Sequence, residues 1–197
     1  MPDPTALDRA ANLITTAARD RSGPLIVAID GRSGVGKSTF AAALADRLTA
    51  RVIEGDDFYA GGTGILGISP ESRAALCIDW QAQARVLATL RAGQAARYHA
   101  FDWDEFDGSL QTTATTVDPA PIILLEGVYA ARPDLRDLVD LRLLLLVPDA
   151  LRLSRLVARE GEIGPWETQW HEAEEWYFTH AAPAEAFDLV LDLDSLS

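Results

Sequence analysis

Near its N-terminus the chain reads Gly31-Arg32-Ser33-Gly34-Val35-Gly36-Lys37-Ser38. This pattern, G-x-x-x-x-G-K-[ST], is typical of a phosphate-binding loop. Residues 25–29 before it form a short apolar run rich in β-branched side chains, and Phe40, Leu44 and Leu48 after it are spaced along one face of a helix. The motif therefore lies between a predicted strand and a predicted helix, which is the context that it requires.

Each part of this loop has a physical role in binding phosphate. Glycines allow the backbone N–H groups to curl around an anion, and the N-terminus of the following helix adds a partial positive charge. Lys37 can reach the β- and γ-phosphates of a nucleotide, and the Ser38 hydroxyl can ligate Mg²⁺. A glycine turn without a ligand is the alternative, which the strand and helix on either side disfavour. The predicted nucleotide-binding residues are Gly31, Ser33, Gly34, Val35, Gly36, Lys37, Ser38 and Thr39.

Composition limits the classes of protein that this chain can represent. Its 197 residues, 48% of them hydrophobic, suffice for one domain spanning 1–197. The net charge of −13 argues against a nucleic-acid partner, because no basic field would attract a polyanion. Cys77 is the single cysteine, so no intrachain disulfide forms, and neither a signal-type segment nor a membrane-spanning apolar run is seen. We therefore predict a cytoplasmic protein without a membrane partner; its oligomeric state, a homodimer included, stays open.

Carboxylates follow two predicted strands. Residues 51–54 are followed by Gly55-Asp56-Asp57-Phe58-Tyr59, and the most strongly apolar strand, 121–127, contains Glu126 at its end. The carboxyl ends of strands form the ligand-binding edge of open α/β sheets. Asp56 or Asp57 could orient a hydroxyl and accept its proton. An acidic turn that caps the next element is the alternative for this pair.

The rest of the chain alternates between strands and helices, which predicts a parallel sheet covered on both faces. Residues 60–70, with four glycines, are predicted to be a mobile loop. Predicted strands cover 25–30, 51–54, 121–127, 141–147 and 187–191, and predicted helices cover 5–19, 39–48, 79–91, 133–139, a segment beginning near Asp149, and 165–180.

Several side chains outside the phosphate loop are candidates for a ligand site. Arg152, Arg155 and Arg159 share one helix face, although a solvated basic stripe would look the same. The aromatic and acidic segment 98–108 is interpreted equally well as a pocket wall or as a partly buried loop. Asp79 could cap a helix or contact a ligand. The stripe Trp166, Trp170, Ala173 and Tyr177 is more typical of a core than of a ligand site.

Taken in order, these motifs resemble those of the uridine kinase-like group of P-loop kinases, relatives of phosphoribulokinase and pantothenate kinase. The resemblance covers residues 24–193. It is carried by the phosphate loop, Asp56-Asp57-Phe58-Tyr59, Leu125-Glu126-Gly127-Val128-Tyr129 and the arginine-bearing helix. It implies an α/β three-layer sandwich with a five-stranded parallel sheet in the order 2-3-1-4-5. It also implies an ATP-dependent kinase that phosphorylates a hydroxyl of a small molecule, with Mg²⁺ as cofactor.

The resemblance also implies roles for individual residues. Asp56 matches the aspartate that activates the acceptor hydroxyl, and Lys37, Arg155 and Arg159 would act on the transferred phosphoryl group. Glu126 matches the acidic residue beside Mg²⁺, which Ser38 would also ligate. A short lid is implied near 152–164. Asp79 and the segment 101–103, which is similar to the family's Tyr-Asp-Phe segment, would contact the acceptor. The predicted acceptor pocket beside Asp56 consists of Asp79, Trp80, Phe101, Asp102, Trp103 and Tyr129.

The chain departs from uridine kinases after Trp103. Uridine kinases carry His and Arg there, whereas residues 104–108 are Asp-Glu-Phe-Asp-Gly. A nucleoside is still the predicted acceptor, and a pantothenate-like or sugar-like alcohol is the alternative. An acidic pocket would repel a phosphorylated acceptor. A P-loop switch ATPase is a further alternative, while a GTPase is disfavoured because Asn12 is the only asparagine and no N-K-x-D motif can exist.

Overall fold

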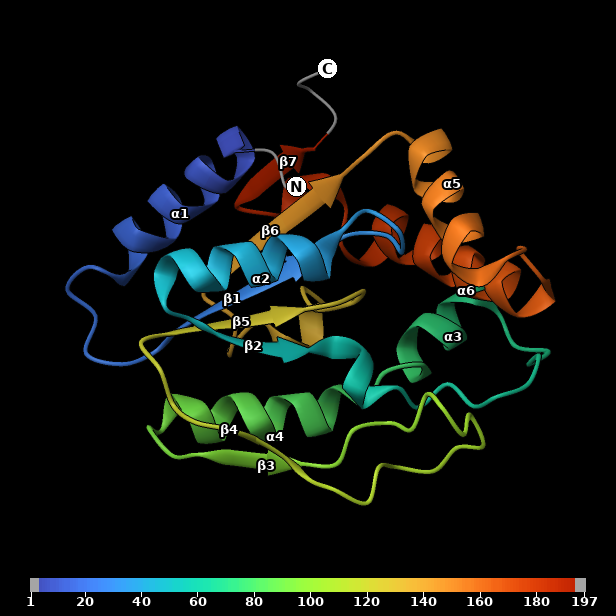
Figure 1. The fold of residues 1–197 in the computed structure, drawn as a ribbon, viewed down its shortest axis with the longest axis horizontal. Coiled ribbons are helices and arrows are strands. Elements are labelled where there is room, and N and C mark those ends of the chain that lie inside the picture. Colours follow the sequence, from blue (N-terminus) through green and yellow to red (C-terminus); the bar gives the residue numbers. More distant parts are fainter. Residues whose placement is uncertain (1–3, 194–197) are drawn as a thin grey trace.

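The computed structural model describes residues 4–193 and contains a five-stranded parallel sheet with helices on both faces (Figure 1). The strand order is β2-β5-β1-β6-β7, which is 2-3-1-4-5 when the strands of this sheet alone are counted. The predicted fold and strand order are therefore confirmed. The strands of this sheet are β1 (Leu25–Asp30), β2 (Arg51–Glu54), β5 (Ile122–Glu126), β6 (Leu141–Leu146) and β7 (Leu189–Asp192).

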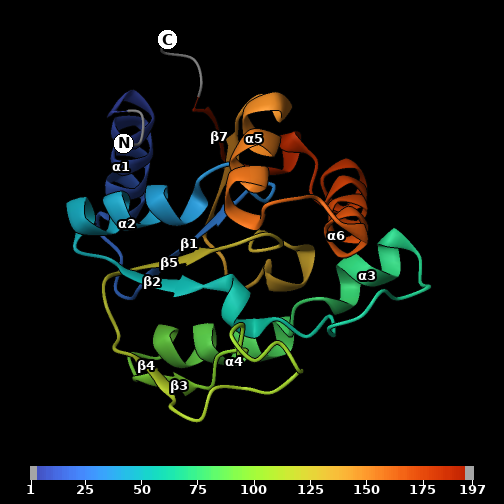
Figure 2. The ribbon, with the colours of Figure 1, turned by 45° about the vertical axis from the view of Figure 1, so that its right-hand side comes forward.

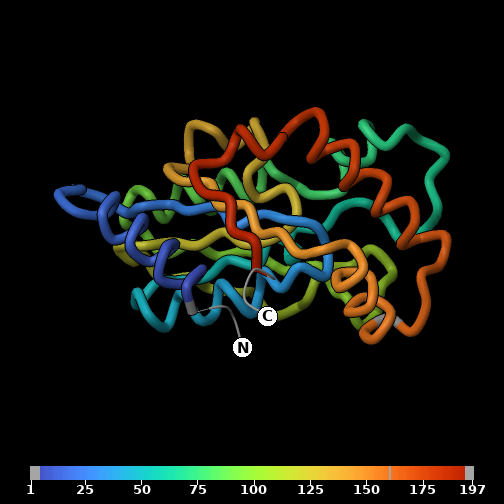
Figure 3. Tube along the Cα trace, turned by 90° about the horizontal axis from the view of Figure 1, so that it is seen from above, coloured from blue at the N-terminus to red at the C-terminus, as the bar shows by residue number. Residues whose placement is uncertain are grey.

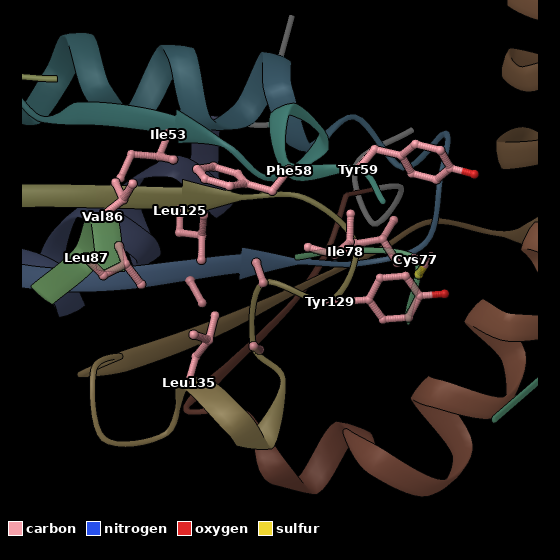
Figure 4. Packing of buried hydrophobic residues seen from close by; sticks show 14 of the residues in the cluster. Ile53, Phe58, Tyr59, Cys77, Ile78, Val86, Leu87, Leu125, Tyr129 and Leu135 are labelled. Atoms are coloured by element: carbon pink, nitrogen blue, oxygen red, sulfur yellow. The ribbon is translucent and has the colours of Figure 1, made fainter. Parts of the chain in front are cut away.

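Two apolar layers hold helices against this sheet. Helices α1 (Pro4–Ala18) and α2 (Lys37–Leu48) cover one face, and α4 (Trp80–Arg91) covers the other (Figures 1 and 2). Successive side chains of a strand point to opposite faces, so Val27 belongs to the first layer and Ile26 to the second. Figure 4 shows the second layer, in which Phe58 lies among side chains from β2 and α4. Both faces of β1 are thus buried, which explains its uninterrupted apolar sequence.

Three further helices gather at the carboxyl end of the sheet. They are α3 (Pro70–Leu76), α5 (Asp149–Glu160) and α6 (Pro165–Trp176) (Figures 1 and 2). Helix α6 continues as a π-helical turn over Tyr177–Ala181, and a 3₁₀ turn over Pro133–Leu135 replaces the longer helix predicted at 133–139. Within residues 4–193, no helix combines the length and the apolar character needed to cross a membrane.

The loop that precedes α3 lies along α6 (Figure 3). Gln169 accepts a hydrogen bond from the Leu66 N–H at 3.0 Å and donates one to the Gly64 carbonyl at 3.1 Å. Arg73 of α3 donates to the Gln169 carbonyl at 3.0 Å. The glycine-rich composition predicted only a mobile loop here, because these partners lie about a hundred residues away in the sequence.

A small antiparallel sheet, also absent from the prediction, flanks the aromatic and acidic segment. It pairs β3 (Ala96–Tyr98) with β4 (Thr115–Val117). The Phe101 N–H donates to the Asp57 carbonyl at 2.7 Å, and Phe101 forms an isolated bridge with Leu110. These bonds place the 101–110 segment beside the end of β2.

Candidate active site

The phosphate loop joins β1 to α2 at the carboxyl edge of the sheet. Gly34 has φ +87°, and a Cβ atom there would lie 2.8 Å from the Arg152 carbonyl oxygen. A Cβ atom at Gly31 would lie 2.6 Å from the Leu145 carbonyl oxygen. Glycine is required at both positions, because the loop packs directly against β6 and α5.

A buried carboxylate, Asp30, fixes the start of this loop relative to β5. It accepts hydrogen bonds from the Gly31 N–H (2.8 Å), the Tyr129 N–H (3.1 Å), the Ala131 N–H (2.9 Å) and the Tyr177 hydroxyl (2.9 Å). Burial raises the pKa of Asp30 to about 6, although these hydrogen bonds favour the ionised form. Asp30 thereby connects the phosphate loop to the turn that follows Glu126, a role that its place at the end of an apolar strand did not reveal.

A cavity of about 320 Å³ lies over the loop, and we call it the phosphate cavity. It brings together the predicted catalytic and metal-binding side chains from four separate parts of the chain. Gly31 and Val35 lie outside its lining, because Gly31 packs against β6 and Val35 is buried in the layer beneath α1 and α2. The lining residues are Ser33, Gly34, Gly36, Lys37, Ser38, Thr39, Asp56, Glu126, Arg155, Leu156 and Arg159.

Cationic groups face this cavity and contact the loop backbone. Lys37 Nζ donates to the Arg32 carbonyl at 3.2 Å, and Arg155 Nη1 donates to the Val35 carbonyl at 3.2 Å. Arg159 lines the same cavity from the last turn of α5. Three cations around a glycine loop at a helix N-terminus form an environment suited to a polyphosphate.

Two carboxylates oppose these cations. Glu126 is 5% exposed, and burial raises its pKa to about 7, while Lys37 and the Ser38 hydroxyl favour its ionised form. Asp56 is an exposed residue that lines this cavity. The surrounding protein still removes enough water to raise the pKa of Asp56, with Lys37 opposing this effect and Glu174 adding to it. A cation bound here would favour the ionised form of both groups.

The oxygen donors fit a hard divalent cation that is bound together with a nucleotide. Among residues 4–193 no group of three or more His, Cys, Asp or Glu side chains could hold a metal ion without other ligands. Mg²⁺ in nucleotide sites needs only one or two protein oxygens, because phosphates and waters complete its shell. The Ser38 hydroxyl and the buried Glu126 carboxylate, which interact with each other, match that requirement.

The neighbouring carboxylate, Asp57, has a different environment. Tyr98 donates its hydroxyl proton to Asp57 Oδ2 at 2.8 Å, and Asp57 lines neither the phosphate cavity nor the cavity described next. The sequence left Asp56 and Asp57 as alternatives. The geometry favours Asp56 as the carboxylate that could reach an acceptor hydroxyl, because Asp56 lines the phosphate cavity and the cavity described next.

A second cavity, of about 260 Å³, adjoins the first, and we call it the aromatic cavity. The two share Ser33, Asp56, Leu156 and Arg159. Trp166 and Trp170 of α6 lie nearly parallel in its wall, with ring centroids 6.0 Å apart, and Trp103 Nε1 donates to the Asp56 carbonyl at 3.3 Å. The lining residues are Ser33, Asp56, Trp103, Leu156, Arg159, Ile163, Trp166, Glu167, Trp170 and His171.

Six residues were predicted to form one acceptor pocket beside Asp56. Among the described residues, Trp103 is the only one of the six that lines the aromatic cavity, so the structure does not bring them together in a single pocket. Asp79 caps α4, accepting from the Ala82 N–H at 2.8 Å, and Trp80 lies under the Arg132 guanidinium. Asp102 accepts from the Asp104 N–H at 3.1 Å. These side chains stabilise local structure around the site.

Phe101 and Tyr129 are buried in the hydrophobic core. Phe101 is 3% exposed and packs 4.8 Å from the Trp103 ring, so it supports the cavity wall from behind. Tyr129 is fully buried and points into the core (Figure 4). Its ring centroid lies 4.7 Å from that of Tyr177. Its backbone N–H is held by Asp30 within the turn that follows β5, which directs the ring inward rather than to the open edge.

The aromatic cavity depends on residues that sequence reasoning assigned to the core. Trp166 and Trp170 were interpreted as an inward stripe, and Trp170 is indeed 9% exposed, yet both rings line the cavity. Their spacing of four residues places both rings on one face of α6, but it is the same for a core stripe and for a cavity wall, so the sequence held no signal that distinguishes the two.

Comparisons with known proteins find relatives in sequence and in fold. No family model matches the chain. The chain is 26% identical over 146 residues to a uridine kinase from Limosilactobacillus reuteri (strain DSM 20016), a match that covers 70% of this chain and 65% of that protein. The chain thus spans about two thirds of the length of that relative.

Two solved structures share the fold. One is described as a possible uridine kinase from Bacillus stearothermophilus, with a TM-score of 0.71, 22% identity, and coverage of 95% of this chain and 98% of that one. The other is a D-glycerate 3-kinase from Cryptococcus neoformans, with a TM-score of 0.65, 12% identity and 97% coverage of each chain. The predicted resemblance to uridine kinase-like P-loop kinases is confirmed by this likeness in sequence and in fold.

Proposed function

We propose that this protein is an ATP-dependent kinase that transfers the γ-phosphoryl group to a hydroxyl of a small molecule. The observation that carries this proposal is the meeting of the two cavities at Asp56. One cavity has the cations and glycines that polyphosphates require, and the other has apolar walls suited to an organic acceptor. A carboxylate at the junction of the two cavities could contact a nucleotide in one and an acceptor in the other.

Phosphoryl transfer depends mainly on positioning and charge neutralisation. Lys37, Arg155 and Arg159 would neutralise the phosphate oxygens, and the loop N–H groups would orient them. Asp56 would orient the acceptor hydroxyl and accept its proton. Ser38 and Glu126 would hold Mg²⁺, which supplies further charge neutralisation when it is bound. A nucleotide switch ATPase has no need for the second cavity, so that alternative is less well supported.

Water exclusion is the remaining requirement, because water would otherwise compete with the acceptor. The segment 161–164 connects α5 to α6, and both helices contribute side chains to the aromatic cavity. We infer that a short lid, comprising the end of α5 and this connection, closes over the bound substrates. This lid is shorter than the one predicted at 152–164. It leaves out Arg152, because Arg152 is buried and its side chain donates a hydrogen bond to Asp149 at 3.1 Å.

For the acceptor we propose a nucleoside. A flat base would stack on the indole rings, and ribose hydroxyls would face Asp56. The uridine kinase relative supports this class. The acidic residues after Trp103 favour instead a neutral or cationic alcohol without a base, which is the second candidate. In both cases the two carboxylates that line the aromatic cavity, Asp56 and Glu167, disfavour a phosphorylated acceptor.

The test is ADP release from Mg²⁺-ATP with uridine, cytidine, their monophosphates, pantothenate and simple sugars, each compared with a reaction lacking an acceptor. Nucleosides should outperform the monophosphates. A monophosphate that exceeds every neutral acceptor would contradict the acceptor class. Equal ADP release with and without all acceptors would favour the ATPase alternative.

A further inference from the structure

The wall between the two cavities contains a buried carboxylate that the proposed chemistry does not use. Glu174 of α6 is 1% exposed. Its Oε1 accepts hydrogen bonds from the Ser33 N–H at 3.0 Å, from the Ser33 hydroxyl and from Trp170 Nε1 at 2.7 Å. Its Oε2 has no hydrogen-bond partner among the described residues, and the nearest cation is Arg152 Nη1 at 4.0 Å.

Ser33 is held through all of its polar groups by the helices that flank the proposed lid. Its N–H and hydroxyl donate to Glu174 of α6, and its carbonyl accepts from Arg152 Nη1 of α5 at 3.3 Å. Trp170 Nε1 also lies 3.0 Å from Ser33 Oγ. Ser33 lines both cavities, and Trp170 lines the aromatic cavity. A single oxygen of Glu174, Oε1, therefore accepts hydrogen bonds from Ser33, which lines both cavities, and from Trp170, which lines the aromatic cavity.

This arrangement costs free energy that a purely structural link would avoid. A buried carboxylate loses its hydration, and a cation 4.0 Å away from the unpaired oxygen compensates only in part. A neutral amide could accept the same hydrogen bonds at lower cost. A negative charge does, however, respond to another negative charge, and the phosphate cavity on the other side of Ser33 is suited to a polyphosphate.

We infer that Glu174 is a positioning residue that couples nucleotide binding in the phosphate cavity to the conformation of the aromatic wall. This inference rests on the proposed function. A bound phosphate attracts the Ser33 N–H and repels the Glu174 carboxylate, so the bond between them weakens. Trp170 moves with Glu174, because its indole N–H donates to the same oxygen. Nucleotide binding thus reorganises the wall that the acceptor contacts, and by linkage the acceptor affects nucleotide affinity by the same factor.

Hydrogen exchange with and without Mg²⁺ and a β,γ-imido analogue of ATP tests this inference without an acceptor. In the wild type, exchange should slow in residues 31–38 and should change by severalfold in residues 165–176. In Glu174→Ala the response at 31–38 should remain and the response at 165–176 should disappear. Trp170→Phe, which keeps a ring but removes the N–H donor, should also lose the α6 response, and it serves if Glu174→Ala does not fold.

Two further variants separate coupling from a merely structural contribution. Glu174→Gln keeps a hydrogen-bond acceptor without the charge and should retain stability but lose most of the α6 response. Glu175→Gln is the matched control, since Glu175 is the next residue of α6 and pairs with Arg32 of the same loop in an exposed position, so it should behave as the wild type. An α6 response that persists in Glu174→Ala, or that is absent from a wild type whose loop is protected, would overturn the inference. No protection of 31–38 in the wild type would overturn the proposed nucleotide site itself, and the coupling with it.

Discussion

The two cavities that meet at Asp56 are built in different ways. The phosphate cavity takes most of its lining from one segment, 33–39, with one side chain added after β2, one from the end of β5 and three from α5. The aromatic cavity combines Ser33 and Asp56 with Trp103 and with residues of α5, α6 and the segment between them. The proposed phosphate site thus depends on a local backbone conformation, whereas the proposed acceptor wall depends on contacts between distant parts of the chain.

This difference follows from what each ligand requires. Every nucleoside triphosphate carries the same triphosphate group, which glycines and a helix N-terminus can bind through main-chain groups. Acceptors differ in shape, so their cavity is formed by side chains that pack on one another. The Phe106 and Trp166 rings, for example, lie 5.6 Å apart although sixty residues separate them.

The largest effect is expected in the phosphate cavity. Lys37→Met should reduce phosphoryl transfer to background, by more than about 10³-fold, because a preorganised cation is lost from the transition state. The fold should be unaffected, since the Lys37 ammonium group donates to the Arg32 carbonyl within the loop and Lys37 belongs to neither apolar layer. Steady-state ADP release and circular dichroism of the purified variant check both statements. Turnover at the wild-type rate would exclude this cavity as the nucleotide site.

The junction between the cavities is tested by Asp56→Asn. We expect kcat to fall by about 10²- to 10⁴-fold, because the proposed proton acceptor is removed, with little change in ATP affinity. Asp57→Asn is the matched control, and its effect should be smaller because Asp57 is bonded to Tyr98 outside both cavities. If Asp56→Asn weakened ATP binding and left kcat intact, Asp56 would belong to the metal site instead.

On the acceptor side, Trp166→Ala should raise the KM for a nucleoside acceptor by about 10-fold, as expected when a stacking contact on the order of 1–3 kcal/mol is removed. The KM for ATP should change little. Trp176→Ala provides the control, because Trp176 lies on the same helix but stacks on His180 away from this cavity. Equal rises in both KM values would mean that the two cavities are not separable as described.

The smallest effect on catalysis, and a measurable one on stability, is expected for Asp30→Asn. The variant should unfold more readily, by about 1–3 kcal/mol, since buried N–H donors lose their acceptor. Burial raises the pKa of Asp30 to about 6, so the wild type loses this group's stabilisation as pH rises from about 4 through 6. The gap in unfolding free energy between the two proteins should therefore narrow over that range in urea titrations. A gap independent of pH would show that Asp30 is ionised throughout.

Sequence patterns predicted most of the sheet because their causes are local. Apolar runs identify strands buried on both faces, and the glycine loop identifies the edge at which they end. The same patterns could not predict α3 or the β3–β4 pair. Helix α3 has only seven residues and is tied to α6 by Arg73 and Gln169, and each of those strands has only three.

The sequence alone predicted the phosphate loop with Lys37 and Ser38, the pair Asp56 and Asp57, and Glu126, since each lies at or soon after the end of a strand, at the ligand-binding edge of a parallel sheet. It could not identify the aromatic wall. Trp166 and Trp170 have the same helical spacing whether they face a core or a cavity. Tyr129 follows a strand end but is buried, and Asp30, which accepts a hydrogen bond from its backbone N–H, comes from a different strand. Which face of α6 meets the loop at Ser33, and which carboxylate of the pair Asp56 and Asp57 meets open space, depends on packing between segments that are distant in the sequence, and no local pattern records such contacts.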